Sequence, residues 1–315
     1  MTVPDRDAPK DLATLAPAAL LAELMPPPAL AEHVRRALAE DLGSAGDVTG
    51  RFMVPESAVA VAVLRFRSAG IACGAAAALE AFRQCAPGIR CSVHAADGER
   101  LEAGAALLSA EGPLRGILAA ERTALNYVGH LSGIATRTAE FVAQAAGTRA
   151  AVCDTRKTIP GMRMLEKWAV RCGGGTNHRI GLHDAMLVKD NHVAGMDPLR
   201  MADAVAAAVR AARAAVPIRF VEVECDRMDQ LDAVLALPAG TVDMVLLDNM
   251  LPAQMADAVR RRDARAPHVL LEASGGVRLA DVAAIAATGV DRISVGALTH
   301  SAPSLDVGLD VEAVR

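Results

Sequence analysis

From Ala151 onward the chain repeats one pattern, in which a short apolar run ends in polar or charged residues and an alanine-rich segment follows. The six runs are AVCDTRK, AMLVKDN, IRFVEVE, DMVLLDN, VLLEASGG and RISVGAL, and segments with helical spacing cover 198–216, 228–237, 252–265 and 279–288. Continuous apolar runs are typical of buried parallel strands, and their alternation with helices is typical of a parallel barrel. The pattern predicts most of a TIM-like barrel, with functional groups at the carboxyl ends of its strands.

The residues before this repeat have a different pattern of apolar and polar residues. Strand-like segments at 59–67, 89–94 and 105–111 surround a helical segment at 75–85, and a further helix is predicted at 30–41. Clustered strands favour an α+β domain. We therefore expect a loose N-terminus over 1–25, an α+β domain over 26–113, a pair of linking helices over 114–150 interrupted at Ser132–Gly133, and an α/β barrel over 151–308.

Composition excludes several classes of partner. Aromatic residues make up 2% of the chain and the net charge is −4, so stacking platforms and basic surfaces for nucleic acid are not expected. The longest apolar stretches are too short to span a membrane, and the N-terminal residues lack the order of a signal peptide, which predicts a cytoplasmic protein. Six cysteines without metal-site spacing are expected to be reduced thiols.

One window of this acidic chain is basic. Between Arg156 and His192 seven Lys or Arg residues stand against three acids, which suits a small anion better than a long polyanion. Three of the cations recur every four residues, a spacing that supports a solvated helical face at least as well as anion binding: Arg163, Lys167 and Arg171. The other four follow strands or lie beside a glycine run, where anion binding is favoured over a structural role: Arg156, Lys157, Arg179 and Lys189.

The glycine run at Gly173–Gly175 has two interpretations. Its backbone N–H groups could approach an anion, or it could be a plain connector, and only the adjacent His178–Arg179 pair favours the first. By itself His178 would more often be a hydrogen-bonded structural histidine, and the roles of His183 and His192 stay open.

Acids end two successive predicted strands. Glu224 and Asp248 should project to the same barrel mouth as the cations, where carboxylates can bind sugar hydroxyls or Mg²⁺ and stabilise a positively charged sugar carbon. Glu222 shares the face of Glu224, and one of the two is expected to pair with a buried cation; Glu224 is the outermost. ASGG and SVGAL then close two late strands, in the arrangement by which barrel loops hold a phosphate, although each could be a tight connector.

These residues match a known family. The matching segments are EDLGSAGDVT, AERTALN, LSGIAT, EVE, LLDN, EASGG, TGVDRISVGALTHS and the block DTRKTIPGMRMLEKWAVRCGGGTNHRIGLHDAMLVKDNH. In these segments the chain closely resembles the quinolinate phosphoribosyltransferase family, from about Leu30 to about Gly308. One departure is Ile159, where the family usually has a second threonine after DTRKT, and it is expected to change loop packing rather than chemistry.

The resemblance implies an incomplete α/β barrel with an N-terminal sandwich domain, to which the last strand and C-terminal tail could return. It also implies a homodimer whose active sites lie between the barrel of one subunit and the N-terminal domain of the other, and leaves further assembly open. The implied reaction is a pentosyl transfer that joins quinolinate to phosphoribosyl pyrophosphate with Mg²⁺. Its products are nicotinate mononucleotide, pyrophosphate and CO₂, on the route to NAD.

The resemblance also implies roles for individual residues. Quinolinate would be bound by Arg122, Arg156, His178, Arg179 and Lys189. The phosphoribosyl donor and its metal would be served by Lys157, Glu224 and Asp248, which are also the catalytic candidates. The 5′-phosphate would be surrounded by Ser274, Gly275, Gly296 and Ala297.

The sequence allows two alternative assignments. A molybdenum-transport-associated relative shares the fold and the DTRKT motif, but the stretch from His178–Arg179 to Lys189–His192 favours the quinolinate enzyme. A phosphosugar-binding barrel without transferase activity would account for the ASGG and SVGAL loops. It would not account for Arg122, Arg156, Arg179 and Lys189 together.

Overall fold

The computed structural model describes residues 15–315. Its described residues form two compact units. The barrel unit comprises residues 140–158 and 175–300, and the N-terminal unit comprises residues 15–139, 159–174 and 301–315. The segments 159–174 and 301–315 thus group with the N-terminal residues although they follow the start of the barrel in sequence.

A six-stranded parallel sheet forms the barrel unit, in the order β6-β11-β10-β9-β8-β7. Its strands are β6 (Ala151–Cys153), β7 (Met186–Val188), β8 (Val221–Cys225), β9 (Met244–Asp248), β10 (Leu270–Ser274) and β11 (Arg292–Ser294). All six predicted strands are present. Because β6 and β7 are both edges of this sheet, the barrel is incomplete, and the predicted fold class is confirmed.

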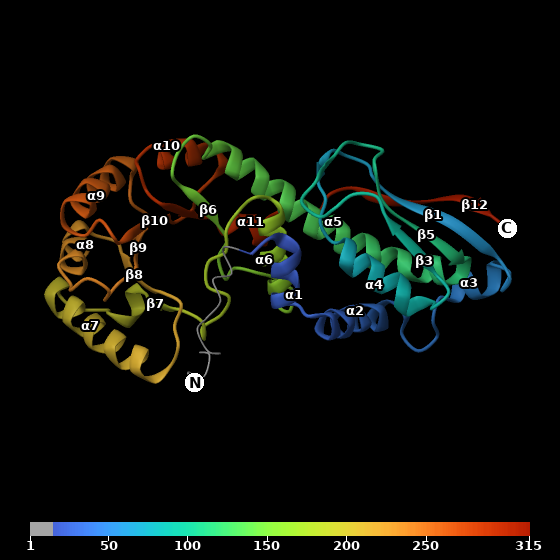
Figure 1. Ribbon diagram of the computed structural model, residues 1–315, viewed down its shortest axis with the longest axis horizontal. Helices are drawn as coiled ribbons and strands as arrows, with labels where there is room; N and C mark the ends of the chain where they lie inside the picture. Colours follow the sequence, from blue (N-terminus) through green and yellow to red (C-terminus); the bar gives the residue numbers. More distant parts are fainter. Residues whose placement is uncertain (1–14) are drawn as a thin grey trace, which may run out of the picture. The chain divides into compact units, whose positions relative to one another are not determined.

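Helices surround these strands (Figure 1). They are α7 (Pro198–Ala215), α8 (Met228–Leu235), α9 (Pro252–Arg265) and α10 (Val282–Ala286), with the short helices η2 (Asp190–His192), η3 (Leu279–Asp281) and α11 (Ala297–His300). Residues of β8 and β9 are almost all buried. The sequence of β9 is accordingly a continuous apolar run, whereas β8 buries Glu222 against His178. The polar residues that end each strand are thereby left at one end of the barrel.

The N-terminal unit contains a four-stranded antiparallel sheet in the order β12-β1-β5-β3. Its strands are β1 (Val59–Phe66), β3 (Arg90–Val93), β5 (Ala106–Pro113) and β12 (Val307–Val314), and β2 (Gly70–Ile71) pairs with β4 (Arg100–Leu101). The helices α4 (Ala75–Cys85) and α5 (Leu114–Gln144) lie along one face of the sheet (Figure 1). The remaining helices of this unit are α1 (Pro17–Leu24), α2 (Pro27–Leu42), α3 (Val48–Met53) and α6 (Arg163–Cys172). The end of the chain returns to this unit, because β12 pairs with β1.

Three expectations from the sequence need correction. The N-terminus is not loose throughout residues 1–25, since 17–24 form α1; residues 1–14 lie outside the described part of the chain. The linking helices are one continuous helix, α5. The solvated helical face on α6 is wrong, because Lys167 is fully buried and Arg163 and Arg171 are half-buried.

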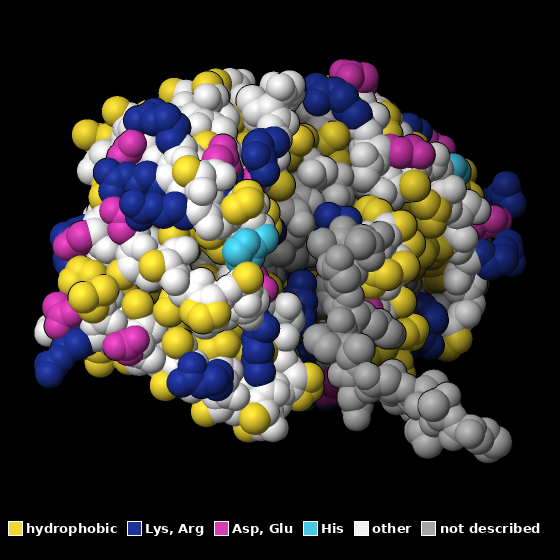
Figure 2. All heavy atoms as spheres, turned by 60° about the vertical axis from the view of Figure 1, so that its left-hand side comes forward, with side chains coloured by type: hydrophobic (Ala, Val, Ile, Leu, Met, Phe, Trp, Pro, Cys, Tyr) yellow, Lys and Arg dark blue, Asp and Glu magenta, His cyan; other side chains and the backbone are white. Residues whose placement is uncertain are grey.

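The surface of the barrel unit carries mixed charge. Figure 2 shows Lys and Arg side chains interspersed with Asp and Glu side chains over this unit. Arg261 contacts Asp232 at 2.6 Å and Asp257 at 2.8 Å, and Arg265 contacts Asp232 at 2.7 Å. Among residues 15–315 no helix has both the length and the apolar character that crossing a membrane requires.

Candidate active site

A pocket of about 830 Å³ opens at the carboxyl ends of the barrel strands, and all of its lining residues belong to the barrel unit. Eleven of the twelve predicted site residues line it: Arg156, Lys157, His178, Arg179, Lys189, Glu224, Asp248, Ser274, Gly275, Gly296 and Ala297. The twelfth, Arg122, lies on α5 in the N-terminal unit, where it is exposed. Parallel strands bring these residues together because their polar ends share one edge of the sheet.

The guanidinium groups of Arg156 and Arg179 both line the pocket. Burial, and next the charge of Arg156, lower the pKa of Arg179, so the two cations repel each other. The Nε atom of Arg156 is buried and has no hydrogen-bond partner among the described residues. A buried polar atom without a partner is costly. A bound anion between the two side chains would remove both penalties.

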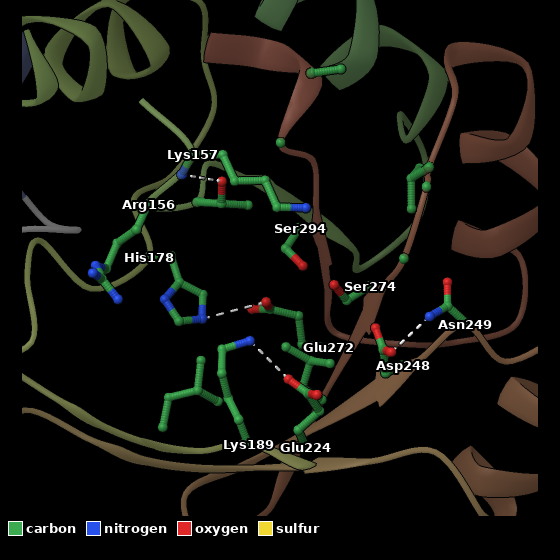
Figure 3. Close-up of a pocket in the computed structure, with 18 of the residues that line it drawn as sticks. Arg156, Lys157, His178, Lys189, Glu224, Asp248, Asn249, Glu272, Ser274 and Ser294 are labelled. Atoms are coloured by element: carbon green, nitrogen blue, oxygen red, sulfur yellow. Dashed lines mark hydrogen bonds and ion pairs between the residues drawn. The ribbon is translucent and has the colours of Figure 1, made fainter. Parts of the chain in front are cut away.

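Lys189 and Glu224 form an ion pair across the pocket floor (Figure 3). Lys189 Nζ donates to Glu224 Oε2 at 3.0 Å, and the Lys189 side chain is 46% exposed, whereas that of Glu224 is 10% exposed. The backbone N–H of Lys189 donates to His192 Nδ1 at 2.8 Å, which places His192 as a structural support of this turn. The lysine is therefore the accessible member of the pair.

A buried charge network lies around His178. Its Nε2 atom lies 2.7 Å from Glu222 Oε2 and 3.5 Å from Glu272 Oε1, and Arg292 Nε donates to Glu272 Oε2 at 2.7 Å. Burial opposes a charge on the imidazole, but Glu272 and then Glu222 raise the pKa of His178. Glu222 thus has a buried partner in the His178 imidazole, whereas Glu224 pairs with the partly exposed Lys189.

The same network bears on metal binding. His178, Glu222 and Glu272 are close enough to share a metal ion. However, Arg292 already supplies a counter-charge to Glu272, and His178 Nε2 lies at hydrogen-bond distance from Glu222, so the protein itself engages both carboxylates. The geometry is that of an ion-pair network beneath the pocket.

His178 also holds the residue that follows it. The backbone N–H of Arg179 donates to His178 Nδ1 at 2.7 Å, so both ring nitrogens are engaged by the protein. Asp154, fully buried at the end of β6, accepts hydrogen bonds from Asn177 Nδ2 at 2.7 Å and from the His178 backbone N–H at 2.9 Å. This segment is therefore fastened to the end of β6.

The glycine run does not line the pocket. Gly174 has a φ of +83°, which favours glycine, and a Cβ on Gly173 would overlap Ala135 and Thr138 of α5. The run is thus a close-packed connector, and the interpretation as an anion-binding loop is not supported by its position.

Asp248 faces the cations from the opposite side of the pocket (Figure 3). Burial, and next the charge of Glu224, raise the pKa of Asp248, while the Asn249 side chain opposes this effect. The register of β9 and β10 places Asp248 directly beside Ser274. The acid is therefore adjacent to the first residue of the glycine turn.

The loops after β10 and β11 are built on small residues. Gly275 and Gly276 have φ angles of +103° and +56°, which other residues rarely adopt. A Cβ on Gly296 would lie 3.0 Å from Lys157 Cδ and 3.1 Å from His300 Nε2. Gly296 thus allows Lys157 to extend into the pocket toward Ser274 and Ser294 (Figure 3).

The sequence left some pocket residues without a role. Asn249, Arg278 and His300 also line the pocket. Arg278 lies two residues after Gly276, and His300 is one helical turn beyond Gly296, so both lie beside predicted phosphate loops. Their positions in the sequence, close to these loops, could have identified them as pocket residues. At Ile159 the backbone N–H donates to Glu166 Oε2 at 3.2 Å, and the residue is 46% exposed and does not line the pocket.

Comparison with known proteins covers most of the chain. Residues 47–132 match the family model for the N-terminal domain of quinolinate phosphoribosyl transferase, and residues 134–310 match the model for its C-terminal domain. A carboxylating nicotinate-nucleotide pyrophosphorylase of Mycobacterium leprae is 47% identical over 282 residues, which cover 89% of this chain and 96% of the relative. A probable enzyme of the same name from Bacillus subtilis is 39% identical over 86% of this chain and 90% of the relative.

Solved structures agree with these sequence matches. The nicotinate-nucleotide pyrophosphorylase of Francisella tularensis superposes with a TM-score of 0.83 at 35% identity, over 96% of this chain and all of that chain. A structure from Ehrlichia chaffeensis has a TM-score of 0.79 at 35% identity, over 89% of this chain and 98% of that chain. Both the fold and the sequence motifs are therefore shared with proteins of this kind.

Proposed function

The chain belongs to the quinolinate phosphoribosyltransferase family, and we propose that the pocket at the barrel mouth is where its reaction takes place. The protein transfers the phosphoribosyl group of phosphoribosyl pyrophosphate to quinolinate with decarboxylation. The products are nicotinate mononucleotide, pyrophosphate and CO₂, in NAD biosynthesis.

One observation carries the assignment of the pocket. Arg156 and Arg179 are held close enough to repel, and Arg156 Nε has no partner among the described residues. Quinolinate is a dianion with adjacent carboxylates, and guanidinium groups bind carboxylates in two-pronged fashion. We assign Arg156, Arg179 and Lys189 to these carboxylates. His178 acts by holding the Arg179 backbone, because both of its ring nitrogens are engaged.

The opposite side suits the phosphoribosyl donor. Glu224 and Asp248 face the sugar, and the turns at Ser274–Gly275 and Gly296–Ala297 surround its 5′-phosphate. Lys157 extends between these turns, and its carbonyl accepts a 2.6 Å hydrogen bond from Thr299 Oγ1. This anchor fixes the backbone from which the lysine reaches the pyrophosphate.

In the first step the pyridine nitrogen donates its electron pair to the sugar carbon while the bond to pyrophosphate breaks. Lys157 stabilises the negative charge that leaves, and the carboxylates of Glu224 and Asp248 face the positive charge that develops at the sugar carbon. The ribosylated nitrogen is then cationic. It stabilises the electron pair left on the ring when the adjacent carboxylate departs as CO₂, and that carbon then takes a proton. The arginines hold the dianion away from bulk water.

The acids also fit a divalent cation. Glu224 and Asp248 offer the oxygen ligands that Mg²⁺ prefers, and burial and next the charge of Glu224 raise the pKa of Asp248, which a divalent cation between the two acids would oppose. We propose that Mg²⁺ is held mainly through the substrate, near these two residues. When bound, it would neutralise part of the charge on the pyrophosphate.

Arg122 requires a second subunit in this proposal. It is exposed on α5 in the N-terminal unit, and the family resemblance assigns it to quinolinate. A homodimer in which each N-terminal unit completes the partner's barrel would supply it. We also propose a cytoplasmic location, supported by six cysteines that are all unpaired.

Ligand binding tests the site directly. Quinolinate should raise the melting temperature and nicotinate should not, because loss of one carboxylate leaves buried cations unpaired, at about 2–5 kcal/mol. Equal stabilisation by both ligands would contradict the proposed carboxylate site.

A further inference from the structure

Asn249 has an unusual backbone. With a φ of 53° it is the single non-glycine residue with a positive φ in the part of the chain that the structure describes. It follows Asp248 at the end of β9. Asparagine adopts this region more readily than most residues, but at a cost relative to glycine. Such conformations persist where the surrounding structure requires them, often at functional sites.

The side chain of Asn249 is turned back onto its neighbour. Its Nδ2 donates to Asp248 Oδ2 at 2.7 Å, as Figure 3 shows. The hydrogen bond joins neighbouring residues across the positive φ of Asn249. The strained backbone and the contact with Asp248 are therefore parts of one arrangement.

Asn249 also reaches the neighbouring strand. Its backbone N–H donates to the Ser274 carbonyl at 3.0 Å, which continues the pairing of Asp248 with Ser274. Its side-chain oxygen lies against Gly275, where a Cβ would overlap it. Asn249 thus contacts both the acid that faces the sugar and the turn assigned to the 5′-phosphate.

We propose that Asn249 is a positioning residue for phosphoribosyl pyrophosphate, which acts through Asp248. It fixes the orientation of the Asp248 carboxylate and its separation from the Ser274–Gly275 turn, so that the sugar and its phosphate are bound at a set distance. This proposal rests on the proposed function, because it needs the sugar donor in this pocket. It concerns one substrate only, since the quinolinate side chains lie on the opposite side of the pocket.

Two substitutions separate the amide from the backbone strain. Asn249→Gly removes the amide and relieves the strained φ, whereas Asn249→Ala removes the amide and keeps the strain. We expect Asn249→Gly to be at least as stable to heat as the wild type and Asn249→Ala to be less stable. Both should weaken calorimetric binding of phosphoribosyl pyrophosphate and raise its KM about tenfold to a hundredfold, as for loss of a hydrogen bond to a charged group. Quinolinate affinity should stay unchanged.

A double-substitution cycle distinguishes positioning from direct contact. If Asn249 acts through Asp248, then Asn249→Gly in an Asp248→Ala background should change binding of phosphoribosyl pyrophosphate by less than twofold. Additive losses would mean that Asn249 binds the substrate itself, and would overturn the proposal. Wild-type affinity and KM in Asn249→Gly would also overturn it. Failure of the wild-type protein to bind phosphoribosyl pyrophosphate or to turn it over would instead contradict the proposed function.

Discussion

Lys189 Nζ lies 3.0 Å from Glu224 Oε2, so a residue assigned to quinolinate is paired with a residue assigned to the phosphoribosyl donor. Under the proposed assignments the two substrates would meet at this pair. Quinolinate would then draw Lys189 toward its carboxylate, and Glu224 would be released to face the sugar. The pair links the two halves of the pocket before either substrate is bound.

Removing the charge of Glu224 should affect the binding of the two substrates differently. Glu224→Gln is expected to leave quinolinate binding intact or up to about fivefold tighter, because a partly exposed ion pair is worth about 0–1 kcal/mol. The same change should weaken phosphoribosyl pyrophosphate binding. Calorimetry with each ligand alone measures both, with Asp203→Asn on the exposed face of α7 as the control. A fall in quinolinate affinity would show that Lys189 needs Glu224 in order to bind it.

The two sides of the pocket should respond to different substitutions. Arg179→Ala is expected to weaken quinolinate binding by about 2–5 kcal/mol, since it removes one partner of a buried carboxylate contact. Asp248→Ala should spare quinolinate and impair use of phosphoribosyl pyrophosphate and Mg²⁺. Titration of each variant with each ligand gives the comparison. Unchanged quinolinate affinity in Arg179→Ala would refute this division.

Sequence patterns predicted the barrel strands because burial on both faces leaves continuous apolar runs, as in β9. They failed at Ser132–Gly133, where local propensity suggests a break in α5. Ser132 Oγ instead bonds both the N–H and the carbonyl of Cys73 at 2.9 Å, and Gly133 packs against Pro303. These contacts are between residues distant in sequence, so a local pattern cannot reveal them.

The functional site could likewise be predicted only in part from the sequence. Residues at strand ends could be placed in the pocket because parallel strands share one edge. The burial of Lys167 and the positive φ of Asn249 could not be predicted, since each depends on packing from other segments. The types of side chain at the strand ends indicated where the functional site lies. Tertiary contacts decide which of these side chains can touch a ligand and which act through a neighbouring residue, as at His178.

The N-terminal unit should show a pH-dependent stability that traces to one acid. Burial raises the pKa of Asp97 from its ordinary 3.8 to about 6, although its Oδ1 accepts a hydrogen bond from the Ala75 N–H. A carboxyl whose pKa is raised by folding favours the folded state at low pH, and that benefit is lost as the pH rises to about 6. Above that pH the ionised acid costs up to about 3 kcal/mol.

Asp97→Asn should therefore raise the melting temperature at pH 7.5 and change it little at pH 4. Thermal unfolding at both pH values measures the effect. Asp41→Asn, at an exposed carboxylate of α2 in the same unit, is the control. Equal effects of Asp97→Asn at the two pH values would contradict the assignment to ionisation of Asp97.

Mixing of inactive variants tests the shared active site. Arg122→Ala and Lys157→Ala should each be nearly inactive, and the two should be unfolded and refolded together at equal concentration. About half of the dimers are then mixed, and each mixed dimer has one intact site if Arg122 serves the partner's barrel. Activity should return to about a quarter of wild type. No recovery, with mixed dimers shown to form, would place Arg122 in its own subunit's site or in a structural role.

The central claim is a phosphoribosyl transfer coupled to decarboxylation, and an isotope measurement tests it most directly. The purified protein is given phosphoribosyl pyrophosphate, Mg²⁺ and quinolinate labelled in the carboxylate next to the ring nitrogen. The account predicts labelled CO₂ and unlabelled nicotinate mononucleotide in equal amounts, with neither formed when phosphoribosyl pyrophosphate is omitted. Retention of the label in the nucleotide, or no product from protein that binds both substrates, would contradict it.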